Sequence, residues 1–253
     1  LSISLFFGGC DSGGGKTENE LVALQDAYFL QFLKFNPVVS TYLGGGGYSD
    51  ELNSANGKLR DFSPEGMAAE LLFYQRVKMG LSTVSLEGLS PKKLLDYRVM
   101  EAQLNFLIWE IGELALHEKA VEAYVLEPVN GVMYQLQQLE NLSGGLFGTE
   151  EEWDQILSRV QAIPDYLNIS QANLKLGIEN GRVSDWRKIE RDGLQGSDAA
   201  ADFFESELPE FAEEFLGDRD FSVKMKGDLA EAVGLAVQAY HDYKTFLEEN
   251  FNL

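Results

Sequence analysis

Apolar residues recur at intervals of three and four along most of the chain, the spacing that places side chains on one face of an α-helix. The first series is Leu21, Leu24, Tyr28, Phe32 and Phe35. Thr17 and Glu20 have the form of a capping box at the start of this helix. Alternation with a period of two, which is typical of strands, is hard to find. The pattern therefore predicts an all-α fold of about eight helices with no significant sheet.

Serine followed by proline marks two further helix starts, at Ser63-Pro64 and Ser90-Pro91. Serine is a favoured N-cap, and proline is tolerated in the first turn because its missing N–H has no partner there. The second of these helices is long. Its predicted buried face consists of Leu94, Tyr97, Met100, Leu104, Leu107, Ile111 and Leu114.

The second half of the chain continues the same pattern. Thr149 and Glu152 form another capping box, and Ser184 and Ser197 are predicted N-caps. The apolar positions that follow are Trp153, Ile156, Val160 and Ile163, and later Leu229, Val233, Ala236, Tyr240, Tyr243 and Phe246. Residues 44–47 are predicted to be a loop. We assign residues 17–253 to one helical domain.

Charge restricts the possible partners. Aspartate and glutamate number 41 against 20 lysines and arginines, so the formal net charge is -21. A surface this acidic repels phosphate backbones, which excludes nucleic acid as a partner. Hydrophobic residues make up 45% of the chain, enough for a substantial core.

The N-terminus indicates export. Residues 1–9 are mostly apolar and end in small residues, as at the end of a truncated signal peptide, and the chain's only cysteine, Cys10, follows. The segment from Phe7 to Cys10 resembles a bacterial lipobox, although Phe7 replaces the usual leucine. This resemblance implies lipidation of Cys10, with residues 10–16 as a flexible linker. We expect a lipid-anchored protein of the bacterial cell envelope that faces the periplasm and contacts the membrane through its lipid.

The inventory of reactive side chains contains no complete catalytic site. The only histidines are His117 and His241, and Val121 stands where an H-E-x-x-H motif beginning at His117 would need its second histidine. No G-x-S-x-G motif is present. We therefore predict no catalytic, metal-binding or cofactor-binding residue in this chain, and Cys10 is its only candidate site residue.

Acidic clusters leave one alternative open. Residues 150–152 are all glutamate, and Glu210, Glu213 and Glu214 form a second cluster. Such runs usually form the solvated face or first turn of a helix, but paired carboxylates can also share a proton. Glu110, which follows Trp109 in an apolar part of the long helix, is the carboxylate that we expect to be most buried.

Several segments, taken in order, resemble one known family. They are Asn36-Pro37 with residues 41–44, residues 61–64, residues 95–97, residues 159–164, residues 172–175, residues 185–193 and residues 239–247. Together they resemble the N-terminal portion of the bacterial family called domain of unknown function 885. The similarity extends from about Leu21 to Leu253.

This resemblance implies a helical, exported or lipid-anchored protein related in fold to zinc metallopeptidases of the gluzincin kind. Their H-E-x-x-H helix lies in a C-terminal half, so zinc is expected only in a longer protein. The last helix reaches Leu253 without a glycine or proline stop, and we expect the polypeptide to continue. The leading interpretation is the N-terminal helical part of a peptidase that acts on peptides. The alternatives are a non-catalytic lipoprotein that binds a peptide or protein, and an enzyme with buried carboxylates. The sequence does not predict an oligomeric state.

Overall fold

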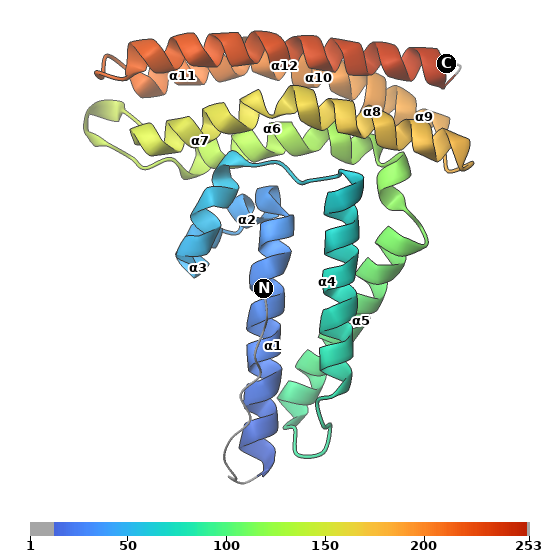
Figure 1. Ribbon diagram of the computed structural model, residues 1–253. Coiled ribbons are helices and arrows are strands. Elements are labelled where there is room, and N and C mark those ends of the chain that lie inside the picture. Colours follow the sequence, from blue (N-terminus) through green and yellow to red (C-terminus); the bar gives the residue numbers. More distant parts are fainter. Residues whose placement is uncertain (1–12, 252–253) are drawn as a thin grey trace. The chain divides into compact units, whose positions relative to one another are not determined.

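The computed structural model describes residues 13–251, and these residues form helices joined by short connections (Figure 1). No strand occurs among them, apart from one isolated antiparallel bridge between Asn141 and Phe147. The predicted all-α fold class is confirmed. No helix within these residues is long and apolar enough to cross a membrane.

The helices cluster into two compact units. The first unit contains residues up to Gln31 and Ala68–Leu114, and the second contains Phe32–Met67 and Ala115–Leu253. The sequence predicted one helical domain over residues 17–253. We describe each unit by itself.

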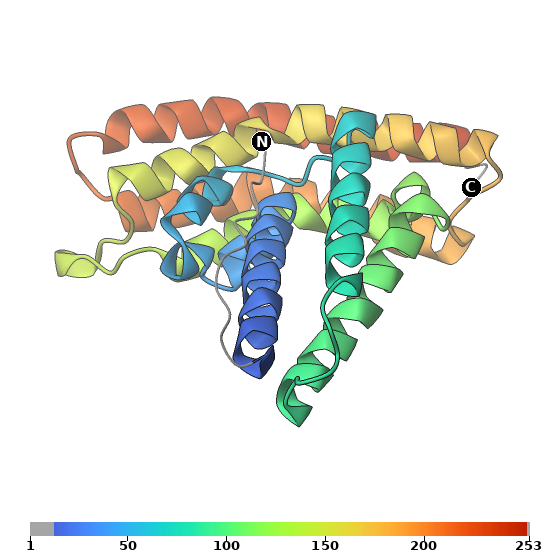
Figure 2. The ribbon, with the colours of Figure 1, turned by 60° about the horizontal axis from the view of Figure 1, so that its bottom comes forward.

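The first unit contains most of α1 (Gly13–Phe35) and α4 (Pro64–Ser82), together with α5 (Pro91–Gly112). In both views α4 lies between α1 and the end of α5, and α5 runs diagonally past α4 (Figures 1 and 2). The rings of Tyr28 on α1 and Tyr74 on α4 have centroids 6.2 Å apart. The carboxylate of Glu18 accepts a hydrogen bond of 2.8 Å from the backbone N–H of Ser90, which joins the start of α1 to the loop before α5.

The second unit contains the remaining elements. They are α2 (Pro37–Tyr42), α3 (Gly45–Tyr48), η1 (Asp50–Gly57), η2 (Leu116–Lys119), α6 (Val121–Gln138), η3 (Ser143–Gly145), α7 (Glu150–Gln161), α8 (Ile163–Glu179), α9 (Trp186–Lys188), η4 (Ile189–Gln195), α10 (Gly196–Asp202), η5 (Phe203–Glu207), α11 (Leu208–Leu216) and α12 (Ser222–Asn250). The long α12 runs beside α7, α8 and α10 (Figures 1 and 2). Trp153 on α7 and Tyr240 on α12 are fully buried in this core.

Three of the predicted caps are confirmed. Ser63 accepts from the N–H of Gly66 at 3.1 Å, and Ser90 accepts from the N–H of Lys93 at 3.5 Å. Thr149 and Glu152 form both hydrogen bonds of a capping box at the start of α7. These three helix starts depend on residues close together in the sequence, which is why local patterns predict them.

Three other predicted helix starts are wrong. Helix α1 begins at Gly13, so Thr17 lies inside the helix, and α1 includes part of the segment assigned to the linker. Ser184 donates to the backbone carbonyl of Lys119, and Asp185 caps α9 in its place. Ser197 lies inside the helical run and donates to the carbonyl of Gly193 at 2.6 Å. Thr17 and Ser197 lie within continuing helices, whose own carbonyls accept from the backbone N–H groups, and at α9 the Asp185 carboxylate accepts from the Arg187 N–H.

Two smaller expectations also fail. Residues 44–47 were predicted to be a loop, but one helical turn, α3, begins at Gly45. A Cβ atom at this glycine would lie 2.2 Å from the Ser40 hydroxyl, so a larger residue here would force the Ser40 side chain to shift. Leu94 was assigned to the buried face of α5 but is 37% exposed. The buried residues of that helix are Tyr97, Met100, Leu104 and Ile111.

Candidate functional site

A cleft of about 440 Å³ opens on the second unit beside α2 and α6. Its polar lining consists of Asn36, Arg60, Glu122, Glu127 and Asn130. Its apolar and aromatic lining consists of Val38, Val39, Tyr42, Ala123, Leu126 and Tyr134. A concave site with apolar walls and a few convergent polar groups is the usual form of a binding site for small molecules and peptides.

Helical periodicity explains why α6 contributes most of the lining. Ala123, Glu127, Asn130 and Tyr134 follow one another at intervals of three and four, so they lie on one face of the helix. The opposite face of α6 is anchored in the core by Val125 and Val132, which are both fully buried. One rigid helix therefore positions the acidic, amide and aromatic groups of the cleft.

Glu127 is a partly buried carboxyl group of the cleft whose pKa is shifted. Its Oε1 accepts a hydrogen bond of 2.8 Å from the backbone N–H of Arg60, and the Tyr166 hydroxyl donates to its Oε2 at 3.4 Å. Close packing on most sides raises the pKa of Glu127 above its usual value of 4.5, although the positive charges of Arg60 and Arg159 act in the opposite direction. The side chain nevertheless keeps part of its surface exposed to the cleft.

A layer of buried hydroxyl and amide groups lies behind Glu127. Asn173 on α8 donates to the Tyr124 hydroxyl at 3.1 Å and to the carbonyl of Phe62 at 2.9 Å. The Tyr124 hydroxyl in turn donates to the carbonyl of His117. Burial raises the pKa values of Tyr124 and Tyr166, so both phenols stay protonated and act as hydrogen-bond donors. This layer holds the floor of the cleft in one arrangement.

Arg159 fixes the segments around the cleft to one another. It is fully buried, and its Nε donates to the carbonyl of Lys58 at 3.0 Å. Its terminal nitrogens donate to Gln135 at 2.7 Å, to Thr41 and the carbonyl of Ala55 at 3.0 Å each, and to the carbonyl of Gly131. Burial lowers the pKa of Arg159 to about 9, opposed by the charge of Glu127.

All five N–H donors of the Arg159 guanidinium are therefore used. Their acceptors come from α2, η1, the segment after η1, and α6. A single side chain thus holds together the backbone segments that form the cleft.

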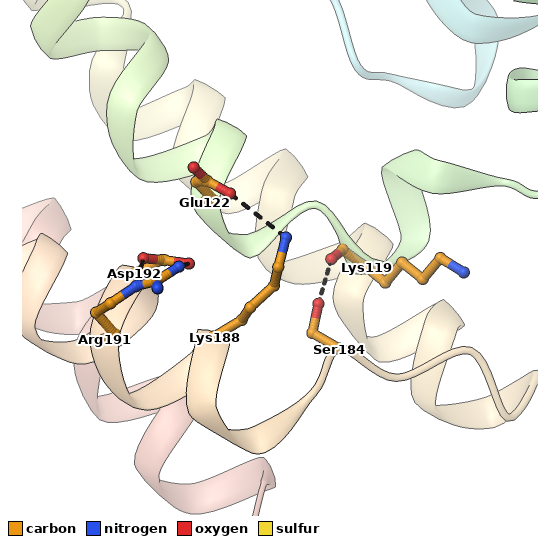
Figure 3. Close-up of polar contacts among 6 residues, drawn as sticks. All are labelled: Lys119, Glu122, Ser184, Lys188, Arg191 and Asp192. Carbon is orange, nitrogen blue, oxygen red and sulfur yellow. Dashed lines mark hydrogen bonds and ion pairs between the residues drawn. The ribbon is translucent and has the colours of Figure 1, made fainter.

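Aromatic and charged groups lie at other parts of the cleft. The rings of Tyr42 and Tyr134 have centroids 4.9 Å apart, and Tyr42 is 61% exposed. Glu122 forms an ion pair of 3.5 Å with Lys188 (Figure 3). Figure 3 also shows that Ser184 bonds to the carbonyl of Lys119, so the segment before α9 is attached to the end of η2, just before α6.

The histidines do not form a metal centre with the neighbouring acidic residues. His117 lies in η2 and is half-buried, whereas His241 lies on the exposed surface of α12. Within residues 13–251, no three His, Cys, Asp or Glu side chains lie close enough to hold a metal ion. Cys10 lies outside the described residues.

One acidic cluster lies at the start of a helix, and the other lies on the exposed surface. Glu150, Glu151 and Glu152 form the first turn of α7, and Glu152 completes the capping box. Glu210, Glu213 and Glu214 are exposed, and Glu213 pairs with Lys226 at 2.8 Å. The expectation that Glu110 is the most buried carboxylate is wrong, because it is only half-buried. Glu70 and Glu118 are 1% and 6% exposed.

Sequence reasoning missed Glu127, Arg60 and Arg159 as site residues. One local feature could have indicated Glu127, since it is the single charged residue of the segment Val125–Val129. Arg159 similarly interrupts the apolar series that contains Ile156 and Val160. A charged residue at a core position of a helix needs buried hydrogen-bond partners, and those partners are distant in the sequence.

A solved structure has the same fold. It is that of a protein from Shewanella oneidensis described as a candidate lipoprotein of unknown function, with a TM-score of 0.68 and 16% sequence identity. The similarity covers 96% of the present chain but 38% of the Shewanella chain. At this identity the comparison supports the fold alone. No curated protein matches the sequence significantly.

The sequence profile of one family covers most of the chain. This family is described as bacterial protein of unknown function (DUF885), and the match extends over residues 37–252. The matched range includes α2, the Arg159 network and all the residues that line the cleft except Asn36. It agrees with the resemblance found in the ordered sequence segments. The chain therefore belongs to the bacterial family of unknown function DUF885.

Proposed function

We propose that the cleft of the second unit binds a segment of extended peptide. The observation that carries this proposal is the convergence of Glu127, Asn36 and Asn130 between apolar walls. A carboxylate accepts hydrogen bonds from peptide N–H groups or from an N-terminal ammonium group, and carboxamides both donate and accept. An extended peptide backbone offers N–H donors and C=O acceptors on each side, which these side chains can bind.

The walls of the cleft suit peptide side chains. Val39 and Leu126 are 39% and 42% exposed beside the polar groups, and the exposed ring of Tyr42 offers a face for stacking. Burial of apolar side chains supplies affinity, while the fixed polar groups orient the backbone. The Arg159 network favours this role because binding to a prearranged cleft costs less conformational entropy.

Peptide binding can be tested with a tryptic digest of casein as the ligand pool. We expect the immobilised chain to retain a subset of peptides, as measured by mass spectrometry. Leu126→Arg should abolish retention because it places a bulky charge in the cleft, whereas Leu235→Arg makes the same change at an exposed leucine outside it. Equal retention by both variants would contradict the proposal.

The second part of the proposal is that a lipid on Cys10 anchors the protein in the bacterial cell envelope. The lipobox-like segment before Cys10 supports this, and so does the description of the Shewanella protein as a candidate lipoprotein. A fatty-acid probe should label the wild-type protein in cells and leave Cys10→Ser unlabelled. Equal labelling of the two proteins would refute the anchor.

The third part concerns hydrolysis. The chain spans 38% of the length of the Shewanella protein, and we propose that the longer protein is a zinc-dependent peptidase whose metal ligands lie outside residues 1–253. The purified chain should then bind no stoichiometric zinc and cleave no peptide. Tight zinc binding that His117→Ala removes would contradict this assignment. The alternative is a non-catalytic lipoprotein, which a stop codon directly after Leu253 in the gene would favour.

A further inference from the structure

Helix α5 carries a second apolar stripe that the first unit does not cover. Its members are Leu95, Val99, Ala102, Phe106 and Trp109, which we call the outer stripe. Leu95 is 63% exposed, Val99 59%, Phe106 52% and Trp109 44%. The buried residues of α5, such as Tyr97 and Leu104, lie on the opposite face at 100° per residue.

The spacing of the outer stripe is that of a coiled-coil seam. Its members follow one another at intervals of four, three, four and three, which is the alternation of a and d positions in a heptad repeat. At 1.5 Å per residue, the 22 residues of α5 form a rod of about 33 Å. A helix that is apolar on two opposite faces normally buries both. A second helix would cover this seam along its length.

The ends of the seam carry opposite charges. The same heptad positions continue to Lys92 at the N-terminal end and to Glu113 just after the C-terminal end, and both side chains are exposed. A lysine near a helix N-terminus and a glutamate near a C-terminus both oppose the helix dipole. The first turn of α5 contains no acidic residue, and its last turn contains no basic residue. These charges therefore do not stabilise α5 itself.

From the spacing and these charges we propose that a second copy of the chain covers the outer stripe, with the two α5 helices antiparallel. In this orientation Lys92 of each copy meets Glu113 of the other, and the two helix dipoles also oppose each other. A parallel pair would instead place like charges together at both ends.

The side chains between the ends match in the same register. In an antiparallel pair the a positions of one helix pack beside the d positions of the other, so the side chains interleave, with Leu95 near Trp109 of the other copy, Val99 near Phe106, and Ala102 near its counterpart at the centre. Each of the two outer pairings combines a smaller with a larger side chain, and the small central alanines let the helices approach closely. Both copies contribute the same residues to the seam, as a two-fold interface requires.

Charge reversal tests the pairing without changing the apolar seam. We would measure sedimentation of the chain with Cys10→Ser, which removes both the lipid and any disulfide between copies. This protein should dimerise. Lys92→Glu and Glu113→Lys should each weaken the dimer about tenfold or more, because each creates like-charge contacts at both ends. Lys92→Glu removes a charge that opposes the helix dipole, so unchanged or increased helical circular dichroism shows that it folds.

Mixing the two charge variants gives the decisive result. In a heterodimer the two substituted side chains, which carry opposite charges, meet at one end of the seam, and the native Lys92 and Glu113 meet at the other. The mixture should therefore dimerise more tightly than either variant does alone. The double variant Lys92→Glu with Glu113→Lys should also recover the dimer.

Two kinds of result would overturn the proposal. A monomeric parent chain would do so and would indicate that another segment of the longer protein or a different polypeptide covers the outer stripe. A dimer insensitive to either single reversal, or a mixture that stays monomeric, would equally overturn the antiparallel pairing.

Discussion

Replacement of the buried Arg159 by methionine should destabilise the second unit severely. Methionine is apolar and replaces the aliphatic part of the arginine side chain, so the substitution removes the guanidinium donors and leaves a small cavity in their place. The carbonyls of Ala55, Lys58 and Gly131 then lose their hydrogen bonds from this side chain. Thr41 and Gln135 also lose a donor. Thr41 keeps its contacts with Pro37 and Asn56.

The magnitude follows from the three backbone carbonyls. Each buried acceptor left without a partner costs about 1–3 kcal/mol. Three of them cost roughly 3–9 kcal/mol, and relief from burying the guanidinium charge offsets several kcal/mol of this. We expect a net loss of about 3–5 kcal/mol, in the range measured when one partner of a buried charged group is removed. For a protein of this size, the corresponding fall in Tm is roughly 6–20 °C.

Urea and thermal unfolding monitored by far-ultraviolet circular dichroism would measure the effect. Arg187→Met is the matched control, because Arg187 is 73% exposed and pairs with Asp185 at the surface. The control should leave the unfolding midpoint nearly unchanged. If Arg159→Met unfolded at the same midpoint as this control, the network would contribute nothing, and our account of the cleft framework would be wrong.

Three further changes give separate expectations. Thr149→Ala should lower the unfolding free energy by about 1 kcal/mol in urea unfolding by removing the cap of α7, whereas Thr149→Ser should largely retain it. Gly177→Ala should lower the unfolding free energy by about 1–3 kcal/mol, because its Cβ would lie 2.0 Å from the Glu118 carbonyl oxygen. Gly234→Ala, in open space on α12, should raise the unfolding free energy by about 0.5–1 kcal/mol. Equal changes in stability for the two variants in thermal unfolding would refute this reasoning. The folded-state pKa of Glu127 lies above 4.5, so the unfolding free energy of the wild type relative to Glu127→Gln should be highest below pH 4.5 and should fall as the pH rises. A difference in unfolding free energy that stays constant in urea titrations at several pH values would contradict the raised pKa.

The sequence predicted the features of this fold that depend on near neighbours. Apolar spacing predicted the helices, and the caps at Ser63, Ser90 and Thr149 follow from residues within one turn. The short π-helical turns at 189–195 and 203–207 have no comparable sequence pattern, and the predicted caps at Ser184 and Ser197 failed beside or between them.

The cleft was not predictable, because distant segments create it. Arg60 and Glu127 are 67 residues apart in the chain, yet a backbone N–H of one binds the carboxylate of the other. Glu110 and Glu127 both occur among apolar neighbours, and the sequence favoured Glu110. The burial and pKa of a carboxyl group depend on tertiary contacts, which one sequence does not reveal. The resemblance to DUF885 was found correctly because it rests on ordered sequence segments.

Peptide binding in the cleft is the central claim, and nuclear magnetic resonance tests it most directly. A peptide retained from the casein digest would be titrated into the ¹⁵N-labelled chain, and amide shifts would be followed residue by residue. The backbone N–H of Arg60 donates to the Glu127 carboxylate, so a peptide bound at Glu127 should shift this amide together with that of Asn130. Leu126→Arg should abolish these shifts. Shifts confined to residues outside the cleft, with the Arg60 amide unmoved at saturation, would contradict the proposed function.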